Sequence, residues 1–253
     1  MANAASELAI PTADQDEAEW RKVRPRTLVA QAADSIVAAV TRGLILPGDR
    51  IVEQDLADAL GTSRVPVREA LRLLESQGLV VSKPYKGMRL MPLTRARVAE
   101  VSEVRLALET TAARRALAHG RNDAPALQGL QRAIDELELM ATRRDGYGLA
   151  SADTAFHREL CALGGNQVLC SVWETIALPM TIIIGLSTLG KSMHGIVEEH
   201  RCLLEAFARG DAAALDRAIE EHVRVQTDAV DFERLIAERR ALRQQSPMEK
   251  PAS

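Results

Sequence analysis

The segment from Ser63 to Gly78 constrains the fold of this chain most, because it has the pattern of an amphipathic helix with two different faces. One face carries apolar residues at helical spacing, namely Val67, Ala70, Leu71 and Leu74. A separate face carries arginines spaced four residues apart, namely Arg64, Arg68 and Arg72. Ser63 is placed to cap the helix and Gly78 to end it. Such a helix must pack its apolar side on other elements while its guanidinium groups remain accessible.

The elements expected around this helix are two helices before it and a hairpin after it. Apolar periodicity predicts helices over residues 28–42 and 52–60, each stopped by a glycine. Short apolar runs at 79–81 and 88–91 predict the two strands of the hairpin. Three helices followed by a small hairpin describe a winged helix-turn-helix, which we place at residues 20–92.

Basic charge is concentrated in the same part of the chain, although the whole chain has a net charge of −3. Residues 20–97 contain 14 Lys and Arg against 7 Asp and Glu, whereas the regions on both sides are acidic. A basic block in an acidic protein favours a polyanionic partner. A solvated basic face would have the same composition, so the motifs must decide between the two interpretations.

From residue 93 onward the sequence predicts only helices. Glycine, asparagine and aspartate punctuate this region, and the helices expected between them span 94–119, 123–143, 147–163, 166–188, 190–208 and 211–241. Helices of these lengths are typical of an antiparallel bundle. The predicted fold class is therefore mainly α, with an all-α antiparallel bundle at 93–241. Residues 1–19 are expected to be a mobile acidic tail and residues 242–253 a second tail.

No sequence feature indicates secretion or membrane insertion. The three cysteines, Cys161, Cys170 and Cys202, form no Cys-x-x-Cys pair and give no disulfide framework. The first residues lack the basic and apolar regions of a signal peptide. The longest uncharged run, 175–190, has 16 residues, and this is short of the ~20 apolar residues that a membrane-spanning helix needs. We therefore expect a buried helix there, a cytoplasmic location and no membrane partner.

Histidines on helical stripes indicate a metal site inside the bundle. Asp153 and His157 are four residues apart, so both point from one face of a helix. His200 and His222 each lie on the apolar stripe of a different helix. Side chains that face the interior of a bundle from three helices can converge on one ion. The alternative for each histidine is a core residue with a single hydrogen bond.

Arg105 lies on the apolar stripe of the first bundle helix, between Val101 and Leu108. A buried guanidinium is costly unless it is paired. One natural partner is the carboxylate of a bound ligand. The alternative partner is an Asp or Glu of the core, and the sequence does not decide between them.

The arginine face of the 64–77 helix fits the major groove of DNA, where arginine can bind guanine edges or phosphates. The residues placed to reach the groove are Ser63, Arg64, Val65, Arg68 and Arg72. Lys83, Lys86 and Gly87 of the hairpin are placed to reach flanking phosphates or the minor groove. The alternative is a solvated helix whose arginines serve solubility.

At these residues the sequence resembles the DNA-binding domain of the GntR family. The run 64–71 reads Arg-Val-Pro-Val-Arg-Glu-Ala-Leu, the run 46–50 reads Leu-Pro-Gly-Asp-Arg, and Leu-Glu-x-x-Gly-Leu follows at 74–79. The resemblance covers residues 26–91. It implies that Arg64 and Arg68 contact DNA and that Gly87 lies at the tip of the wing. Val65 stands where many relatives carry threonine, so a hydroxyl contact there is in doubt.

The second half resembles the FCD effector domain of the FadR-type branch of this family, over residues 94–230. The matching residues are Arg105, Glu109, the run Asp153-Thr154-Ala155-Phe156-His157, Gly165-Asn166, Glu199-His200-Arg201 and Glu221-His222. The resemblance implies that Asp153, His157, His200 and His222 hold a divalent metal. It also implies that Arg105 helps to bind a carboxylate, and we add Asn166 as a ligand-binding residue. Six bundle helices rather than seven would place the chain near the shorter, VanR-like form. Zn²⁺ is the first expectation from the histidine ligands, with Mn²⁺ or Ni²⁺ as alternatives.

These observations predict a regulator of transcription of the repressor type, in which a basic DNA-binding module is joined to a ligand-binding bundle. A homodimer would read a two-fold related operator on double-stranded DNA, and a small organic acid would change its affinity. We do not expect an enzyme, because no general base accompanies the metal ligands. The alternatives are a metal-dependent, hydrolase-like enzyme and a sensor for which the metal itself is the signal.

Overall fold

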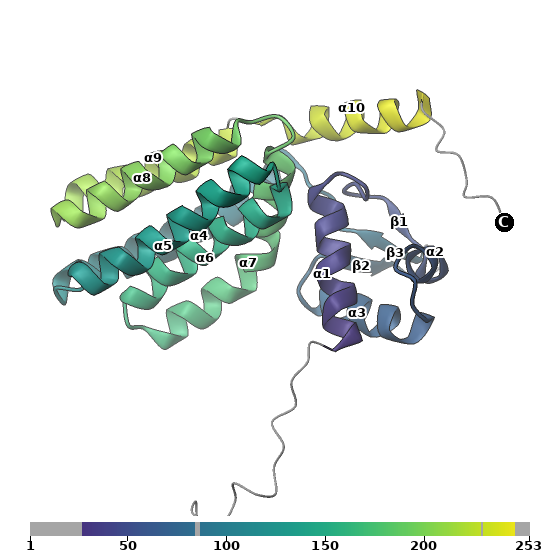
Figure 1. Cartoon of the computed structure of the whole chain (residues 1–253), viewed down its shortest axis with the longest axis horizontal. Helices are drawn as coiled ribbons and strands as arrows, with labels where there is room; N and C mark the ends of the chain where they lie inside the picture. Colours follow the sequence, from purple (N-terminus) through teal and green to yellow (C-terminus); the bar gives the residue numbers. More distant parts are fainter. Residues whose placement is uncertain (1–26, 84–86, 229, 246–253) are drawn as a thin grey trace, which may run out of the picture.

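The computed structural model describes residues 27–83, 87–228 and 230–245. It contains two parts, a small N-terminal domain with three helices and a sheet, and a larger helical domain (Figure 1). The mainly α fold class expected from the sequence is confirmed. Of the two predicted tails, 1–19 lies outside the described residues.

The N-terminal domain is built around the amphipathic helix that the sequence singled out. Its elements are α1 (Leu28–Thr41), β1 (Arg50–Ile51), α2 (Glu53–Ala59), α3 (Arg64–Ser76), β2 (Val80–Lys83) and β3 (Gly87–Leu90). The apolar stripe of α3 is buried, as predicted, and α3 packs against α1 and α2. Ser63 occupies the N-cap position of α3, but its side chain makes no capping hydrogen bond. Ser63 is therefore the N-cap residue by its backbone conformation, and the predicted capping by its side chain is wrong.

The hairpin is part of a three-stranded antiparallel sheet with the order β1-β3-β2. β2 pairs with β3 from Val80 opposite Leu90 to Lys83 opposite Gly87. β1 pairs with the other edge of β3, with Arg50 opposite Arg89. The sequence analysis did not predict β1, because a strand of two residues is too short to show alternation.

Six helices form the bundle of the second domain, and each begins or ends near a predicted boundary. They are α4 (Arg95–Ala118), α5 (Ala124–Arg143), α6 (Gly146–Leu163), α7 (Gln167–Ser187), α8 (Met193–Arg209) and α9 (Ala212–Asp228). Side-chain caps at Thr94, Asp123, Asn166 and Ser192 accept hydrogen bonds from the first turns of α4, α5, α7 and α8. α4 and α6 lie at the centre of this arrangement, because α4 contacts α6, α7 and α9 while α6 contacts α4, α5 and α7.

The last predicted helix, 211–241, is divided into two. α9 ends at Asp228 and α10 (Phe232–Gln245) begins after Asp231. The break has a local cause, because the Asp231 carboxylate accepts a hydrogen bond from Arg234 N at 3.0 Å and starts a new helix. The described residues of the second half therefore contain seven helices, but α10 lies outside the bundle, so the bundle has the six helices that the sequence predicted. α10 also continues to Gln245, into the segment 242–253 that was expected to be a tail. Residues 246–253 lie outside the described part of the chain.

α10 leaves the bundle and runs to the N-terminal domain, where it lies above α1 and β1 in Figure 1. Near its end Arg240 Nη2 donates to Pro47 O at 2.5 Å, and Arg240 and Arg243 form ion pairs with Asp49 at 3.2 and 3.0 Å. The two domains are therefore joined by α10 as well as by the chain between β3 and α4.

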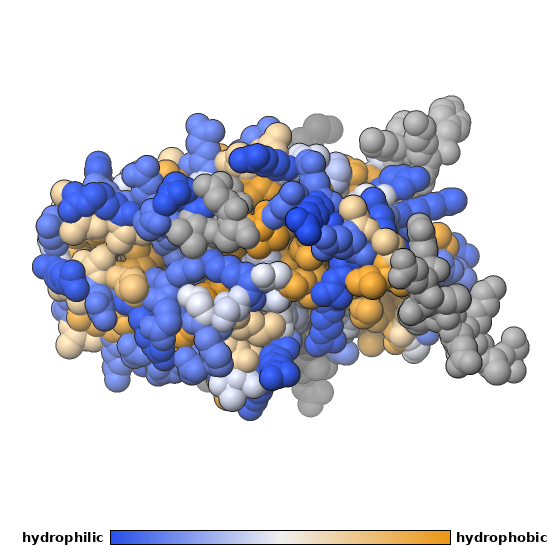
Figure 2. All heavy atoms as spheres, turned by 90° about the horizontal axis from the view of Figure 1, so that it is seen from above, coloured by the Kyte–Doolittle hydropathy of each residue, from blue (hydrophilic) through white to orange (hydrophobic). Residues whose placement is uncertain are grey.

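A second contact between the domains is the packing of α1 against α7. A Cβ atom on Gly185 would lie 3.3 Å from Thr41 Cα and overlap the Thr41 side chain, so only glycine allows this approach. By length and composition α7 could cross a membrane, but 56% of its most apolar window is buried inside the molecule. The sequence expectation of a buried helix is confirmed at residues 179–187, all of which are buried. Figure 2 shows another face of the molecule, on which hydrophilic side chains surround smaller hydrophobic patches.

Candidate functional site

The outer face of α3 carries the arginines predicted to meet DNA. The side chains of Arg64, Arg68 and Arg72 are 55%, 43% and 64% exposed. Val65 is also exposed, at 67%. Because the apolar stripe of α3 is buried against α1, the helix presents a cationic surface on its opposite side.

Glu53, at the start of α2, holds two of these arginines. Its carboxylate accepts hydrogen bonds from Arg68 Nε and Nη2, the latter at 2.9 Å, and from Arg64 Nη2 at 3.4 Å. The hydrogen bond from Arg68 is the largest influence on the pKa of Glu53, which is lowered from its ordinary value. This residue was missed by the sequence analysis. The contact joins the first helix of the helix-turn-helix to the second and fixes the direction of Arg68.

The wing is the hairpin of β2 and β3, and only part of it is described. Gly87 begins β3 with φ +72°, a conformation that glycine adopts without strain. Lys83 pairs with it through the backbone of β2. Lys86, also predicted to contact DNA, lies outside the described residues.

Six side chains from the centre of the bundle form one buried cluster. They are Arg105 and Glu109 of α4, Asp153 and His157 of α6, His200 of α8 and His222 of α9, and each is at most 4% exposed. The structure therefore brings together the four predicted metal ligands and the predicted ligand-binding arginine. We call this set the buried cluster.

The three imidazoles of the buried cluster converge. One nitrogen atom from each of His157, His200 and His222 lies within 4.8 Å of the others. His157 Nε2 and His222 Nε2 are 3.0 Å apart. His200 Nδ1 is 2.7 Å from Ile196 O, and this contact turns Nε2 toward Asp153 Oδ1 at 3.2 Å.

Arg105 is the cation of the buried cluster. Its Nε donates to Glu109 Oε1 at 2.8 Å, while its Nη2 lies 2.5 Å from His157 Nε2 and 3.1 Å from His222 Nε2. Of the two partners considered for this buried arginine, the structure contains the core carboxylate, Glu109. Glu109 is four residues after Arg105, so the shared helix face was the signal that could have identified it.

Glu109 also connects the buried cluster to its surroundings. Its Oε2 lies 2.9 Å from His157 Nδ1, which leaves His157 Nε2 as the nitrogen that faces the other histidines. Its Oε1 accepts a hydrogen bond from Trp173 Nε1 of α7 at 3.3 Å. Asn166, predicted to bind ligand, instead caps α7, with Oδ1 accepting from Val168 N and Leu169 N at 3.1 Å. No hydrogen bond among the described residues links Asn166 to the buried cluster.

Burial and charge separate the protonation states in the buried cluster. Burial raises the pKa of Glu109, but the charges of Arg105 and His157 outweigh it and lower this pKa to about 2. Burial also opposes ionisation of Asp153, yet His200, His157 and Arg105 hold its pKa below the ordinary value. For His157 and His222, burial lowers the pKa, and Arg105 lowers it further. Ionised carboxylates and neutral imidazoles are the forms that bind metal.

The donor set fits a divalent ion. Imidazole nitrogens bind such ions at ~2.1 Å, so two of them on one ion lie ~3 Å apart, close to the separation of His157 Nε2 and His222 Nε2. His200 Nε2 and Asp153 Oδ1 are both buried and lie 3.2 Å apart, a separation that two ligands of one ion can have. His222 Nδ1 is also buried without a hydrogen bond among the described residues.

Comparison with known proteins assigns both domains. Residues 28–90 match the family model of bacterial regulatory proteins of the gntR family, and residues 100–225 match the FCD domain. An HTH-type transcriptional regulator encoded in an unstable DNA locus of Streptomyces ambofaciens is 31% identical over 205 residues, which cover 76% of this chain and 80% of the relative. The chain belongs to the GntR family.

Other GntR-family proteins support this membership. The probable D-xylose utilization operon transcriptional repressor of Paenarthrobacter nicotinovorans is 29% identical over 207 residues, covering 82% of this chain and 90% of the relative. The solved structure of E. coli McbR/YncC shares the fold, with a TM-score of 0.62, 20% identity, and coverage of 85% of this chain and 98% of that one. The family and these relatives are transcriptional regulators rather than enzymes. This GntR-family chain is therefore a DNA-binding transcriptional regulator, and the hydrolase-like alternative is dropped.

Proposed function

We propose that this protein is a cytoplasmic, homodimeric repressor whose operator affinity is set by a divalent metal and a small carboxylate bound at the buried cluster. The observation that carries this proposal is the convergence of three imidazoles, two carboxylates and one guanidinium in a fully buried position. Repressors among the relatives support the sign of regulation. Zn²⁺ is the proposed ion, with Mn²⁺ and Ni²⁺ as alternatives.

In this proposal His157, His200, His222 and Asp153 hold the ion, which supplies a positive charge for a ligand carboxylate. Arg105 Nη2 donates to the same two Nε2 atoms that an ion would need. Its N–H groups must therefore turn to another acceptor when these nitrogens bind metal. The carboxylate of a small organic acid is the natural acceptor, because a guanidinium and a carboxylate form short, charge-assisted hydrogen bonds.

Helix α6 offers a direct route from the buried cluster to the DNA-binding domain. Asp153 and His157 point into the cluster, while the neighbouring Thr154 and Arg158 line a cavity of about 290 Å³ between α6 and α7 of the bundle and α1 and α3. Beside this cavity α6 contacts α1, and α1 packs on α3, so a shift of α6 on ligand binding would displace α3 through α1. In a dimer, such a shift would change the spacing of the two α3 helices and hence operator affinity.

Trp173 adds a second connection between the same places. It donates to Glu109 of the buried cluster, and Arg158 lies over its ring at 5.6 Å from the centroid. Arg158 is also paired with Glu174 at 2.5 Å, and both line the cavity between the domains. A change in the position of Glu109 can thus move Trp173, and Trp173 can move Arg158 at the surface that faces α3.

Exposed apolar side chains on α4 and α7 support a homodimer. The two helices contact each other. Val104 of α4 is 42% exposed, and Val168 and Val172 of α7 are 74% and 43% exposed. Exposed apolar residues gathered on neighbouring helices are typical of an interface. We propose that this surface is buried against a second copy of the chain.

Metal analysis of the purified protein tests the proposed centre. We expect about one ion per chain in the wild type and a strong loss in His157→Ala and His222→Ala, because each removes one ligand. His194→Ala is the matched control, since His194 is exposed and lies 3.6 Å from Glu138, outside the buried cluster. Equal metal content in all four proteins would contradict the proposal.

The direct metal sensor remains a second candidate because the buried cluster is closed. Its side chains are at most 4% exposed, and none of them lines the cavity between α6 and α3. In a sensor, a chelator alone would change operator affinity. In the leading proposal, the change would require the organic acid as well as the ion.

A further inference from the structure

The outer face of the N-terminal sheet carries an arginine to which no role has been assigned. Arg50 of β1 is exposed, whereas the next residue, Ile51, is buried. Because side chains alternate along a strand, Arg50 points away from the core of the domain. Its guanidinium forms neither a hydrogen bond nor an ion pair with any residue that the structure describes.

The strand register places a second arginine directly opposite Arg50. Arg89 of β3 is its Cα partner, so both side chains leave the sheet on the same face. Like charges in such a position destabilise an antiparallel pair. Arg89 Nη1 donates to Gly48 O at 2.9 Å, and in the described part of the chain no carboxylate pairs with either arginine. The sheet therefore keeps two positive charges together that the described residues do not neutralise.

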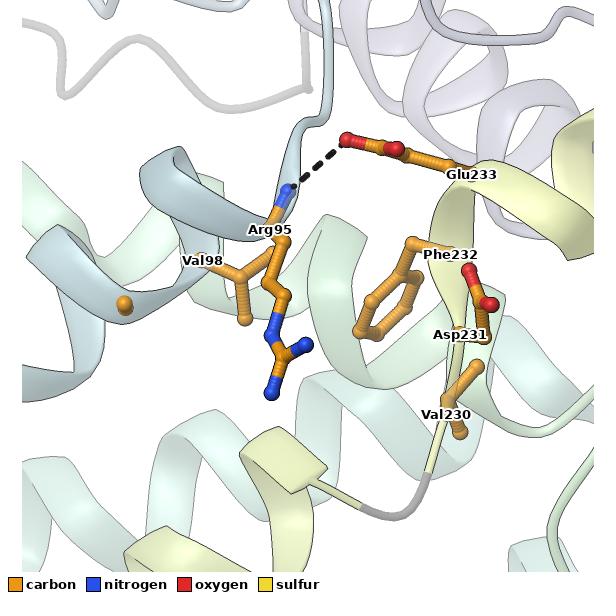
Figure 3. A pocket seen from close by; sticks show the side chains of 7 residues that line it. Arg95, Val98, Val230, Asp231, Phe232 and Glu233 are labelled. Atoms are coloured by element: carbon orange, nitrogen blue, oxygen red, sulfur yellow. Dashed lines mark hydrogen bonds between the residues drawn. The ribbon is translucent and has the colours of Figure 1, made fainter.

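The carboxylate that precedes β1 is already occupied by α10. This helix leaves the bundle at the joint drawn in Figure 3, where Glu233 Oε1 accepts from Arg95 N at 3.4 Å. Near the other end of α10, Arg240 and Arg243 pair with the Asp49 carboxylate at 3.2 and 3.0 Å. Asp49 is thus neutralised by two arginines from the end of the chain.

The side chain of Arg50 extends toward the wing. Gly87 lies two residues before Arg89 on β3, so it is the diagonal neighbour of Arg50, and a long side chain can reach that far. A Cβ atom at Gly87 would lie 3.8 Å from Arg50 Nε. The guanidinium group therefore lies beside the first residue of β3, in the element predicted to reach flanking phosphates.

Arg50 is also near the arginine face of α3. It precedes Glu53 by three residues, and Glu53 holds Arg64 and Arg68. Three residues of extended chain span at most about 11 Å. Each strand of B-DNA carries a phosphate about every 3.4 Å along the helix axis. A duplex bound to α3 therefore brings several phosphates close to Arg50.

We propose that Arg50 binds a backbone phosphate of the DNA that α3 reads, next to the contacts of the wing. The partner is a phosphate rather than a base, because no described residue orients this guanidinium as Glu53 orients Arg68. The phosphate supplies the negative charge that Arg50 and Arg89 lack within the described part of the protein. The contact adds affinity for any DNA sequence and leaves the choice of operator to α3.

Fluorescence anisotropy titrations at several salt concentrations test this proposal. The full-length protein is titrated with DNA from its own promoter region and with unrelated DNA. At ~0.1 M salt, Arg50→Gln should bind both DNAs about threefold or more weakly than the wild type, and by the same factor. The slope of log affinity against log salt concentration should fall in magnitude by about 0.9 for each bound chain. Arg50→Lys, which keeps the charge, should retain the slope.

Arg209→Gln is the matched control, because it removes the same charge from the bundle. Arg209 is exposed at the end of α8 and is paired with Glu205 at 3.4 Å. This variant should bind both DNAs with the affinity and the slope of the wild type. Thermal unfolding without DNA at low salt is the second measurement. Arg50→Gln should unfold at the wild-type temperature or above it, because the repulsion from Arg89 is relieved.

Three results would overturn the proposal. In the first, Arg50→Gln keeps the affinity and the slope of the wild type, so Arg50 makes no contact with phosphate. In the second, only binding to operator DNA weakens, and the contact is then to a base. In the third, Arg50→Gln unfolds at a lower temperature than the wild type, which would make Arg50 a residue that stabilises the fold.

Discussion

Glu53 is the residue whose effect on DNA binding is least obvious from its charge. A carboxylate near DNA repels phosphate, yet it holds Arg68 through two hydrogen bonds and so limits the directions in which this guanidinium can point. Orientation matters for base contacts, whereas contacts to phosphates tolerate a mobile arginine. Removing the charge of Glu53 should therefore raise the affinity for DNA phosphates and lower the preference for particular bases.

For Glu53→Gln we accordingly expect tighter binding to unrelated DNA and a ratio of operator to unrelated affinity that falls about fivefold or more. Fluorescence anisotropy with both DNAs at one salt concentration measures this ratio. Glu69→Gln is the control, because Glu69 pairs with Arg72 on the exposed surface of α3. If the ratio in Glu53→Gln matches the wild type, Glu53 does not orient Arg68 for recognition.

The buried imidazoles make stability depend on pH. The pKa values of His157 and His222 are lowered in the folded protein from an ordinary value of 6.5, mainly by burial. Below that ordinary value the unfolded chain binds protons that the folded chain does not, so acid favours unfolding. Glu109, with its pKa lowered to about 2, adds to the loss of stability between its ordinary value of 4.5 and that point.

The chelator-treated protein should therefore lose thermal stability as the pH falls below 6.5, and lose more below 4.5. Thermal unfolding followed by circular dichroism between pH 8 and pH 4 measures this. A melting temperature that stays constant from pH 7 to pH 5 would show that these histidines are not buried in the neutral form.

At the scale of elements, the contact between α1 and α7 depends on Gly185. Any larger residue meets the backbone of Thr41 as well as its side chain, and Thr41 is itself buried. We expect Gly185→Val to destabilise the protein by about 1–3 kcal/mol, the usual cost of overpacking. Chemical denaturation of the variant and of Gly190→Ala measures it, because a Cβ at Gly190 meets nothing within 4 Å. Equal stability of the two variants would mean that α1 and α7 do not pack as described.

The long periodic helices could be predicted from the sequence, but the junctions between elements were predicted less accurately. The stripe of α3 and the arginines opposite it follow from spacing alone, and so do the inward faces on which His157, His200 and His222 lie. The division of 211–241 was missed because the pattern continues through Asp231, which acts as a cap only when the chain turns there. Strand β1 was missed because its only support is the pairing with β3.

The partners within the site depend on tertiary contacts in the same way. Arg105 was expected to be buried, and Glu109 could have been found from its spacing on the same helix, but only the fold shows that two histidines also lie against this arginine. The sequence did not indicate a role for Trp173, because its indole bonds to Glu109, which lies 64 residues earlier in the chain on another helix. Spacing within one helix can be read from the sequence, whereas the distance between helices is decided by packing.

At the scale of the whole molecule, three connections join the effector bundle to the DNA-binding domain. They are the packing of α1 against α7, the contact of α6 with α1, and the contact of α10 with the Gly43–Asp49 turn. The contact of α6 with α1 starts on the helix that carries Asp153 and His157 of the buried cluster. A regulator of this kind can therefore combine two chemical signals in one operator affinity.

The central claim, that the arginine face of α3 reads operator DNA, is tested most directly by anisotropy titrations of the full-length protein against DNA from its own promoter region. We predict binding that prefers this sequence, falls linearly with the logarithm of salt concentration, and weakens between about fivefold and about a hundredfold in Arg68→Ala. Equal affinity for operator and unrelated DNA, or an unchanged affinity in Arg68→Ala, would contradict the account.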